Sequence, residues 1–423
     1  MQDSVTIFKN EILNLLNEYF VEDDFNEMFF ESDKSLNDET DISSKISDLY
    51  RRQLDIRIEE TTERTQIDRV ITFAEKNLES DKFFEFILDL ANICIASGKM
   101  NLAQEIFNKI NKKTEDKTLK AKSLIGLADI CSRKANWTRS ISLITEAESI
   151  YKATDDKRGI ANCFNMLGAI SGEMGDIEMA KNYFSQSLFF ANESSEKELN
   201  AKIETNLGVV NSILGNYDEA INHLEAALVI YKETEDFRRV SESYLNIGLN
   251  FLHSNDNIAA MVAFDKGIEI AIENHYFGVL ALLYLAKSEL LLAIKDIRMA
   301  KEFADKALSI SHTLDDKLTI ADIYKVRGII AREMNDTQTA ESYFMVSLRI
   351  NTNQRNGLNI AETSLELGSL YEKLNNQELS IHYLTQALDY YRKTNAKDKV
   401  SKIEKMLELS VVQSNETKAH NEQ

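Results

Sequence analysis

Side chains that could carry out catalysis or bind a metal are few and scattered along this sequence. The three cysteines, Cys94, Cys131 and Cys163, show no CxxC spacing and are expected to fill core positions in a reducing compartment. Acidic pairs such as Asp155-Asp156 are typical of a solvated surface. No histidine has a partner at a metal-ligand spacing; the histidines are His223, His253, His275, His312, His382 and His420. No P-loop, nucleophile elbow or HExxH motif occurs. We therefore expect no enzymatic activity, no cofactor and no metal site.

The composition favours a nearly all-helical protein. Its 423 residues include no proline and only 14 glycines, which excludes proline-rich linkers and disfavours turn-rich β-structures. The net charge of −20 disfavours a groove that neutralises the phosphates of a nucleic acid. No apolar run approaches the roughly 18–20 residues of a membrane span, and the start of the chain lacks the basic segment of a signal peptide. We predict a cytoplasmic protein with no membrane span and no nucleic-acid partner.

An internal repeat decides the fold. When the sequence from Ala121 is divided into 40-residue units, seven units align with one another and the last ends at Val400. A shorter unit over 84–120 precedes them. Position 8 of each unit is small: Ala128, Gly168, Gly208, Gly248, Ser288, Gly328 and Gly368. Position 20 is small as well: Ser140, Ala180, Ala220, Ala260, Ala300, Ala340 and Ser380. Position 27 follows the same rule, as at Ala227.

These positions predict pairs of closely packed helices. Position 8 lies within a first helix and position 20 early in a second, so small side chains at both let the two helices approach, while position 27 faces the next pair. Short polar breaks separate the helices. Gly175 and Gly215 can take the left-handed conformation that ends a helix, and Asn255, Asn335 and Asn375 occupy the same place.

The column pattern resembles the tetratricopeptide repeat, for example over residues 206–236. The resemblance covers roughly residues 84–400 and implies an all-α fold, a right-handed α-solenoid of stacked antiparallel helix pairs. It departs from the common 34-residue form because no proline closes the second helix and each unit is six residues longer. The 40-residue spacing is similar to the long-helix subclass of spindle-orientation G-protein regulators, bacterial Rap-type signalling proteins and kinesin light chains.

The remaining segments are expected to flank the array. We predict an acidic N-terminal arm over 1–44 with an amphipathic helix at 3–20, and a helical cap or degenerate repeat over 45–83 made of helices at 45–60 and 64–80. Eight repeats are expected over 84–400, followed by a capping helix over 401–412 with Ile403, Met406 and Leu407 facing inward, because the last repeat otherwise exposes its stacking face. Residues 413–423 are expected to be a disordered tail.

The resemblance implies that first helices line a concave groove, with contacts at positions 2, 5, 6, 9, 12 and 13. The groove is polar in the early units, apolar between 245 and 292, and charged beyond 322. An asparagine at position 6 can hydrogen-bond the backbone of an extended peptide, although bonding between helices is the alternative. The predicted peptide-binding residues are Asn165, Lys202, Thr205, Asn206, Leu245, Asn246, Leu249, Leu285, Lys325 and Arg332. The family's clamp for chaperone C-termini is not expected, because Lys325 is followed by Ile329 where asparagine is required.

Two functions remain open on this basis. The first is a non-enzymatic scaffold or adaptor that binds a peptide or helix of a protein partner in the groove. The second is an intracellular signalling regulator that resembles Rap-type proteins and acts on a response regulator or answers to a peptide. The helix at 3–20 could also self-associate or occupy the groove, or it could simply cap the array.

Overall fold

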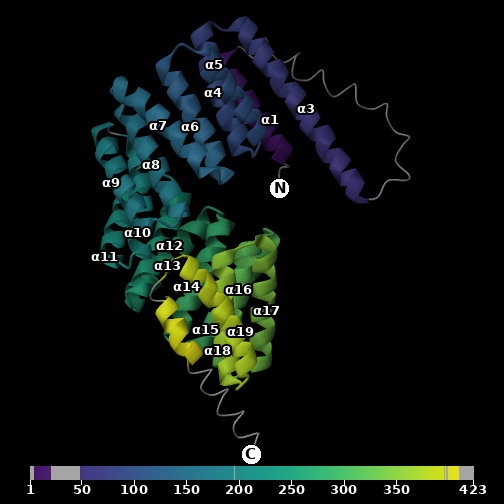
Figure 1. Ribbon diagram of the computed structural model, residues 1–423, viewed down its shortest axis with the longest axis vertical. Coiled ribbons are helices and arrows are strands. Elements are labelled where there is room, and N and C mark those ends of the chain that lie inside the picture. The colour runs from purple at the N-terminus through teal and green to yellow at the C-terminus, as the bar shows by residue number, and fades with distance from the viewer. Residues whose placement is uncertain (1–3, 21–47, 195, 395, 397–398, 409–423) are drawn as a thin grey trace, which may run out of the picture. The chain divides into compact units, whose positions relative to one another are not determined.

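The computed structural model describes residues 4–20, 48–194, 196–394, 396 and 399–408, with side chains from 8–20 and from 63 onward. Every regular element in this part of the chain is an α-helix (Figure 1). The chain divides into two compact units, residues 1–174 with 182–195, and residues 175–181 with 196–423. The acidic segment predicted after residue 20 and the tail predicted over 413–423 lie outside the described residues.

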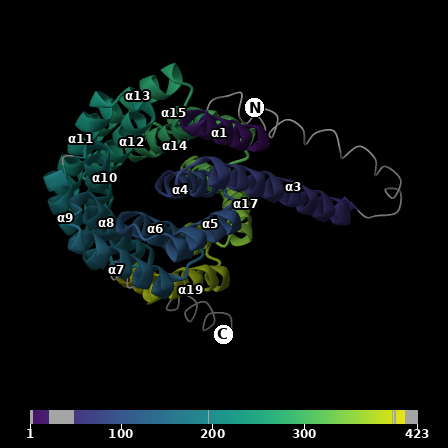
Figure 2. The ribbon, with the colours of Figure 1, turned by 90° about the horizontal axis from the view of Figure 1, so that it is seen from above.

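The first unit holds two N-terminal helices followed by helix pairs. Its helices are α1 (Ser4–Tyr19), α3 (Asp48–Asn77), α4 (Ser80–Ala96), α5 (Met100–Lys113), α6 (Lys117–Arg133), α7 (Trp137–Ala153), α8 (Lys157–Glu173) and most of α9 (Ile177–Ser194). The second unit continues with α10 (Lys197–Ile213), α11 (Tyr217–Glu233), α12 (Phe237–His253), α13 (Asn257–Glu273), α14 (Phe277–Ala293), α15 (Ile297–Thr313), α16 (Lys317–Glu333), α17 (Thr337–Gln354), α18 (Gly357–Lys373) and α19 (Gln377–Lys393). Within this second unit, α11 and α13 lie on the outer side of an arc and α10 and α12 on its inner side (Figure 2).

The helices begin and end at the residues that the breaks predict. Aspartate caps recur, as where Asp156 accepts a hydrogen bond from the backbone N–H of Gly159 at 2.8 Å. Gly175 and Gly215 have φ values of 84° and 79°, which confirms the predicted left-handed ends. Among the described residues the same conformation recurs at 20-residue intervals from Ala135 to Gly175 and from Gly215 to Asn375, also at residues such as Lys295 and Arg355 that the sequence did not single out. The turn inside a pair and the turn between pairs are therefore alike.

In five units a glycine at position 8 packs against a large residue at position 24 of the same pair. A Cβ on Gly248 would lie 2.4 Å from the Phe264 ring, and one on Gly208 would lie 2.6 Å from Leu224. The five glycine pairs are Gly168–Phe184, Gly208–Leu224, Gly248–Phe264, Gly328–Phe344 and Gly368–Leu384. In the other two units position 8 is Ala128 or Ser288, and position 24 is Ile144 or Ala304 rather than an aromatic residue. The large residue at position 24 therefore fills the space that the glycine leaves, as expected of close-packed interiors.

Positions 20 and 27 also meet the surfaces predicted for them. The Ser140 hydroxyl donates to the backbone carbonyl of Ala128 at 2.7 Å, which joins positions 20 and 8 directly. At position 27, a Cβ on Gly267 would lie 2.8 Å from Leu283 of the next pair. The small-residue columns therefore set the spacing both within and between helix pairs.

The N-terminal helices correct one prediction. The two helices expected at 45–60 and 64–80 form a single helix, α3, because the intervening residues contain neither glycine nor proline to end it. The apolar stripe of α1 is buried within the first unit: Phe8, Ile12 and Leu16 are at most 2% exposed, and α1 packs on α4. This stripe is therefore not an exposed surface.

The end of the array is covered by a short helical segment over 399–408. Ile403 is fully buried, and Met406 and Leu407 pack against the cluster formed by the last helix pair. Their inward orientation agrees with the sequence.

None of the described helices combines the length and apolarity that crossing a lipid bilayer requires.

Candidate functional site

The first helices of four consecutive pairs in the second unit form one continuous surface. Helices α12, α14, α16 and α18 contact one another in that order. A cavity of about 230 Å³ opens on this surface, which we call the first-helix pocket. Its lining is Leu245, Leu249, Leu282, Leu285, Ala286, Glu289, Asp322, Lys325, Asn359 and Glu362. All but Asn359 stand at positions 2, 5, 6 or 9 of their units.

One side of the first-helix pocket is apolar. Leu245 and Leu249 of α12 are half-buried, and Leu282 of α14 is 40% exposed. Helix α14 is apolar on all sides, so it fills the core with fully buried residues such as Leu283 and still has leucines left for this surface. Leu282 is the most exposed of these leucines, whereas Leu285 is only 8% exposed, and Leu245 and Leu249 also pack against the core of the helix pairs.

The rest of the pocket lining is polar and charged. The Lys325 ammonium forms an ion pair with Glu362 and lies 3.7 Å from an Asp322 oxygen. The Asn359 side-chain amide donates a hydrogen bond to Asp322 at 2.8 Å. Glu289, which is mostly buried, forms no hydrogen bond or ion pair with any described residue. The pocket therefore contains one carboxyl group without a partner.

The proton affinities of these groups follow from burial and from their crowding. Burial raises the pKa of Glu289 to about 7; Asp322 and Glu362 add to this, while Lys325 opposes it. Burial also raises the pKa of Asp322, and Glu362 raises it further. Burial alone would lower the pKa of Lys325, but Glu362 and Asp322 outweigh it and raise that pKa. Lys325 is thus a fixed cation, whereas Glu289 is poised between its two charge states near neutral pH.

Four of the predicted binding residues are brought together in this pocket, namely Leu245, Leu249, Leu285 and Lys325. Asn246 lies between the two leucines of α12 in sequence, is half-buried, and its side-chain amide has no partner among the described residues.

The other predicted residues do not join the pocket. Asn165 belongs to the first unit and is only 3% exposed, so its amide is not available to a partner. Thr205 donates to the carbonyl of Ala201 at 2.9 Å, and Asn206 is engaged within the chain. Lys202 is exposed. Arg332 pairs with Glu366 at 2.7 Å.

Glu289 and Asn359 are the functional candidates that the sequence did not reveal. Glu289 stands at position 9 of its unit, a contact position, and it is the only acidic residue in the apolar stretch 281–294. A single carboxyl group in a largely apolar stretch was the sequence feature that could have identified Glu289 as a candidate. Asn359 lies two residues before the unit that starts at Ala361 and is not at a contact position, so only the structure shows that it lies beside Asp322.

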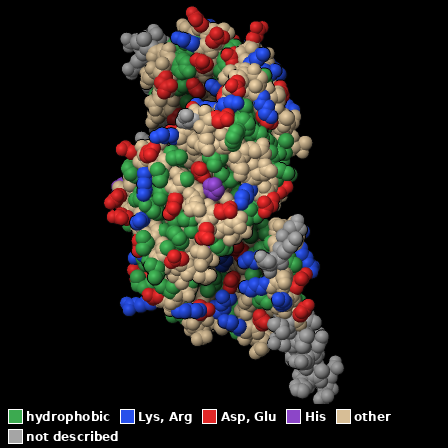
Figure 3. All heavy atoms as spheres, turned by 90° about the vertical axis from the view of Figure 1, so that its left-hand side faces the viewer, with side chains coloured by type: hydrophobic (Ala, Val, Ile, Leu, Met, Phe, Trp, Pro, Cys, Tyr) green, Lys and Arg blue, Asp and Glu red, His purple; other side chains and the backbone are tan. Residues whose placement is uncertain are grey.

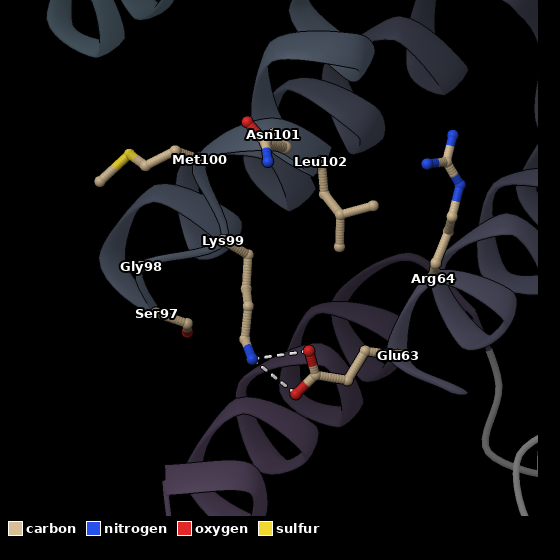
Figure 4. A pocket seen from close by; sticks show the side chains of 8 residues that line it. All are labelled: Glu63, Arg64, Ser97, Gly98, Lys99, Met100, Asn101 and Leu102. Carbon is tan, nitrogen blue, oxygen red and sulfur yellow. Dashed lines mark hydrogen bonds and ion pairs between the residues drawn. The ribbon is translucent and has the colours of Figure 1, made fainter. Parts of the chain in front are cut away.

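A larger cavity, of about 460 Å³, lies in the first unit between α3 and the turn from α4 to α5. Lys99 reaches across it to Glu63, at 2.6 Å (Figure 4). Arg64 forms an ion pair with Glu105 at 2.6 Å. Its charges are thus already paired, and they fix α3 to the α4–α5 turn.

On the face shown in Figure 3, acidic and basic side chains are interspersed among apolar ones, without a large area of one sign.

Comparison with known proteins agrees with this geometry. Two family models described as tetratricopeptide repeat match residues 161–188 and 199–273. These residues are tetratricopeptide repeats. A third model, described as an uncharacterized protein conserved in bacteria, matches residues 315–413 of this repeat protein. Among curated protein sequences, none matches the chain.

Solved structures show the same fold at low sequence identity. A Rap protein complexed with competence and sporulation factor is 13% identical over 82% of this chain and 97% of its own, with a TM-score of 0.58. Aspartyl phosphate phosphatase F from Bacillus subtilis is 15% identical over 83% and 92%, with a TM-score of 0.57. The quorum sensor NprR from B. thuringiensis is 11% identical over 81% and 99%, with a TM-score of 0.59. The predicted right-handed α-solenoid, and the predicted similarity to Rap-type proteins at the level of fold, are confirmed.

Proposed function

We propose that this tetratricopeptide repeat protein is a non-enzymatic, cytoplasmic interaction adaptor that holds a peptide or helix of a protein partner on the surface formed by α12, α14, α16 and α18. The first-helix pocket carries this proposal, because it brings the exposed Leu282 and the half-buried Leu245 and Leu249 together with a carboxyl group that has no partner among the described residues. Both features leave binding free energy available to another molecule.

The surface suits a polypeptide. The free amide of Asn246 has both a donor and an acceptor, so it can pair with a backbone peptide unit whatever side chain that unit carries. Recurrence of positions 2, 5, 6 and 9 from helix to helix offers a row of contacts at regular spacing, as an extended or helical segment requires. The apolar stripe of α1 is covered by its own unit, so we propose that α1 caps the array rather than mediating self-association.

The test is a selection from a phage library of random nonapeptides on the full chain. Selected peptides should lose most of their affinity for the Leu249→Glu and Leu282→Glu variants, because each places a charge in the apolar side of the pocket. Val262→Glu is the matched control, since Val262 is 50% exposed on α13 outside the pocket. Circular dichroism should show the same helical content in all three. Unchanged affinity for both pocket variants would contradict the proposal.

The structural similarity favours one second candidate, a signalling regulator. The three Rap-like structures match more than four-fifths of this chain, and their names include a bound signalling factor, a phosphatase and a quorum sensor. We propose as the alternative that the adaptor controls a response regulator in answer to a peptide. Incubating the protein with a phosphorylated response regulator separates the two, because an adaptor leaves the rate of phosphate loss unchanged and a phosphatase accelerates it.

A further inference from the structure

We infer that the first-helix pocket takes the side chain of a lysine or arginine from a polypeptide partner, with a neighbouring apolar side chain of the same partner packed on its leucines. This inference rests on the proposed function, since it names the chemistry of the partner that the surface recognises.

The first reason is the balance of charge in the pocket. Glu289, Asp322 and Glu362 supply three carboxyl groups and Lys325 a single ammonium group. Lys325 is shared between Glu362 and Asp322, and Asp322 also accepts a hydrogen bond from Asn359. The charges of Lys325, Glu362 and Asp322 are therefore paired with one another, which leaves Glu289 unpaired. The three carboxyl groups are not arranged to hold a metal ion, as no such group occurs among the described residues.

The second reason is the position of Glu289. Its carboxyl group is mostly buried, forms no hydrogen bond or ion pair with a described residue, and lines the cavity. A carboxylate in such a place has little water and no donor from the protein, so a cation that supplies a donor is favoured there. A lysine or arginine entering the cavity would provide it. An acidic side chain would meet the unpaired carboxyl group of Glu289 and an excess of carboxyl groups over ammonium groups, so the pocket discriminates by sign.

The third reason is size and shape. A volume of about 230 Å³ is smaller than the roughly 300–1,000 Å³ of sites that enclose a whole small ligand, so it fits one or two side chains of a larger molecule. Leu249 and Leu285 line the same cavity as the charges. Lysine and arginine have apolar stems and charged ends, and they can lay the stem on the leucines while the end reaches Glu289.

Binding of a cation should be linked to the proton on Glu289. The groups that act on it are Asp322 and Lys325 from α16 and Glu362 from α18, while α12 presents leucines; no charged residue of α13 or α15 shifts its pKa. With its pKa raised to about 7 in the free protein, Glu289 is mainly protonated at pH 6 and mainly ionised at pH 8. A cationic partner binds the ionised form, so its affinity should rise about tenfold between these pH values.

The experiment uses the nonapeptides selected from the random phage library on the full chain at pH 8. They should be enriched in lysine or arginine beside leucine, isoleucine or phenylalanine. Replacing that basic residue by glutamine, or introducing Glu289→Gln into the protein, should each weaken binding about tenfold, and Glu289→Gln should abolish the pH dependence. Glu269→Gln is the control, because Glu269 is exposed on α13 and its loss changes the net charge equally.

The outcomes separate this inference from the proposed function. Peptides whose binding depends on Leu249 but not on a basic residue or on Glu289 would overturn the inference and leave the proposed function standing. Peptides that bind regardless of Leu249 and Leu282, or a selection that yields none, would overturn the proposed function itself. Equal losses for Glu289→Gln and Glu269→Gln would show a general effect of net charge and would also overturn the inference.

Discussion

Replacing Gly248 by alanine tests how closely the two helices of a pair approach. The added Cβ would lie 2.4 Å from one ring carbon of Phe264, 2.6 Å from a second and 3.1 Å from a third. Carbon atoms in contact prefer about 3.5–4.0 Å, so the ring or the helix must move by about 1 Å. Phe264 is fully buried, which leaves the ring no open space to move into.

The expected cost is the difference of two effects. Overpacking a core costs about 1–3 kcal/mol, whereas alanine is a better helix former than glycine by about 1 kcal/mol. Gly248→Ala should therefore destabilise the protein by up to about 2 kcal/mol. Gly278→Ala is the matched control, because no atom lies within 4 Å of the position its Cβ would take, and it should stabilise the protein by up to about 1 kcal/mol.

Urea unfolding followed by circular dichroism compares the variants. An array of repeats need not unfold in one step, so midpoints of the same transition should be compared rather than extrapolated free energies. Gly248→Ala should move the midpoint to lower urea and Gly278→Ala to higher urea. If both variants gained stability equally, positions 8 and 24 would not be in the close contact that defines the helix pairs.

Three further predictions concern charge and cysteine chemistry. The pKa of Glu289 is raised from 4.5 to about 7 in the folded state, so ionising this residue lowers the free energy of unfolding by up to about 3 kcal/mol as the pH rises through 7. Glu289→Gln should therefore raise the urea midpoint at pH 8 and make little difference at pH 4. Lys99→Met strands Glu63, which is only 5% exposed, and should lower the midpoint of the first unit by the equivalent of about 1–3 kcal/mol; loss of less than about 0.5 kcal/mol would show that water replaces the lysine. Burial raises the pKa of Cys94 to about 12, so a thiol reagent should modify the less buried Cys131 first in the native protein, and faster labelling of Cys94 would contradict its burial.

The repeat made most of the fold predictable from the sequence. Small residues at fixed intervals identified the helix pairs, because glycine or alanine recurring opposite a large residue has few explanations other than close packing. Gly175, Gly215 and the asparagines at the same place located the ends of first helices. The turn at Lys295 could not be found this way, since tertiary packing forces a left-handed conformation on a residue that does not favour it.

The candidate site was predictable only in part. The leucines of α12 and α14 were predicted because they are apolar residues at contact positions of first helices, which the resemblance places along the groove. Asn165 also stands on a first helix, yet its side chain is buried, because sequence position does not tell which neighbour covers a side chain. The role of Glu289 depends on what α16 and α18 place beside it, and these helices are far away in sequence.

Site-specific photocrosslinking tests most directly whether the surface of α12, α14, α16 and α18 holds the partner. A photoreactive phenylalanine derivative is placed at Leu282, which is 40% exposed on α14, or at Val262, which is 50% exposed on α13. Irradiation with a peptide from the phage selection should give a covalent adduct at Leu282 and none at Val262. An adduct at Val262 alone, or at both positions equally, would contradict the account.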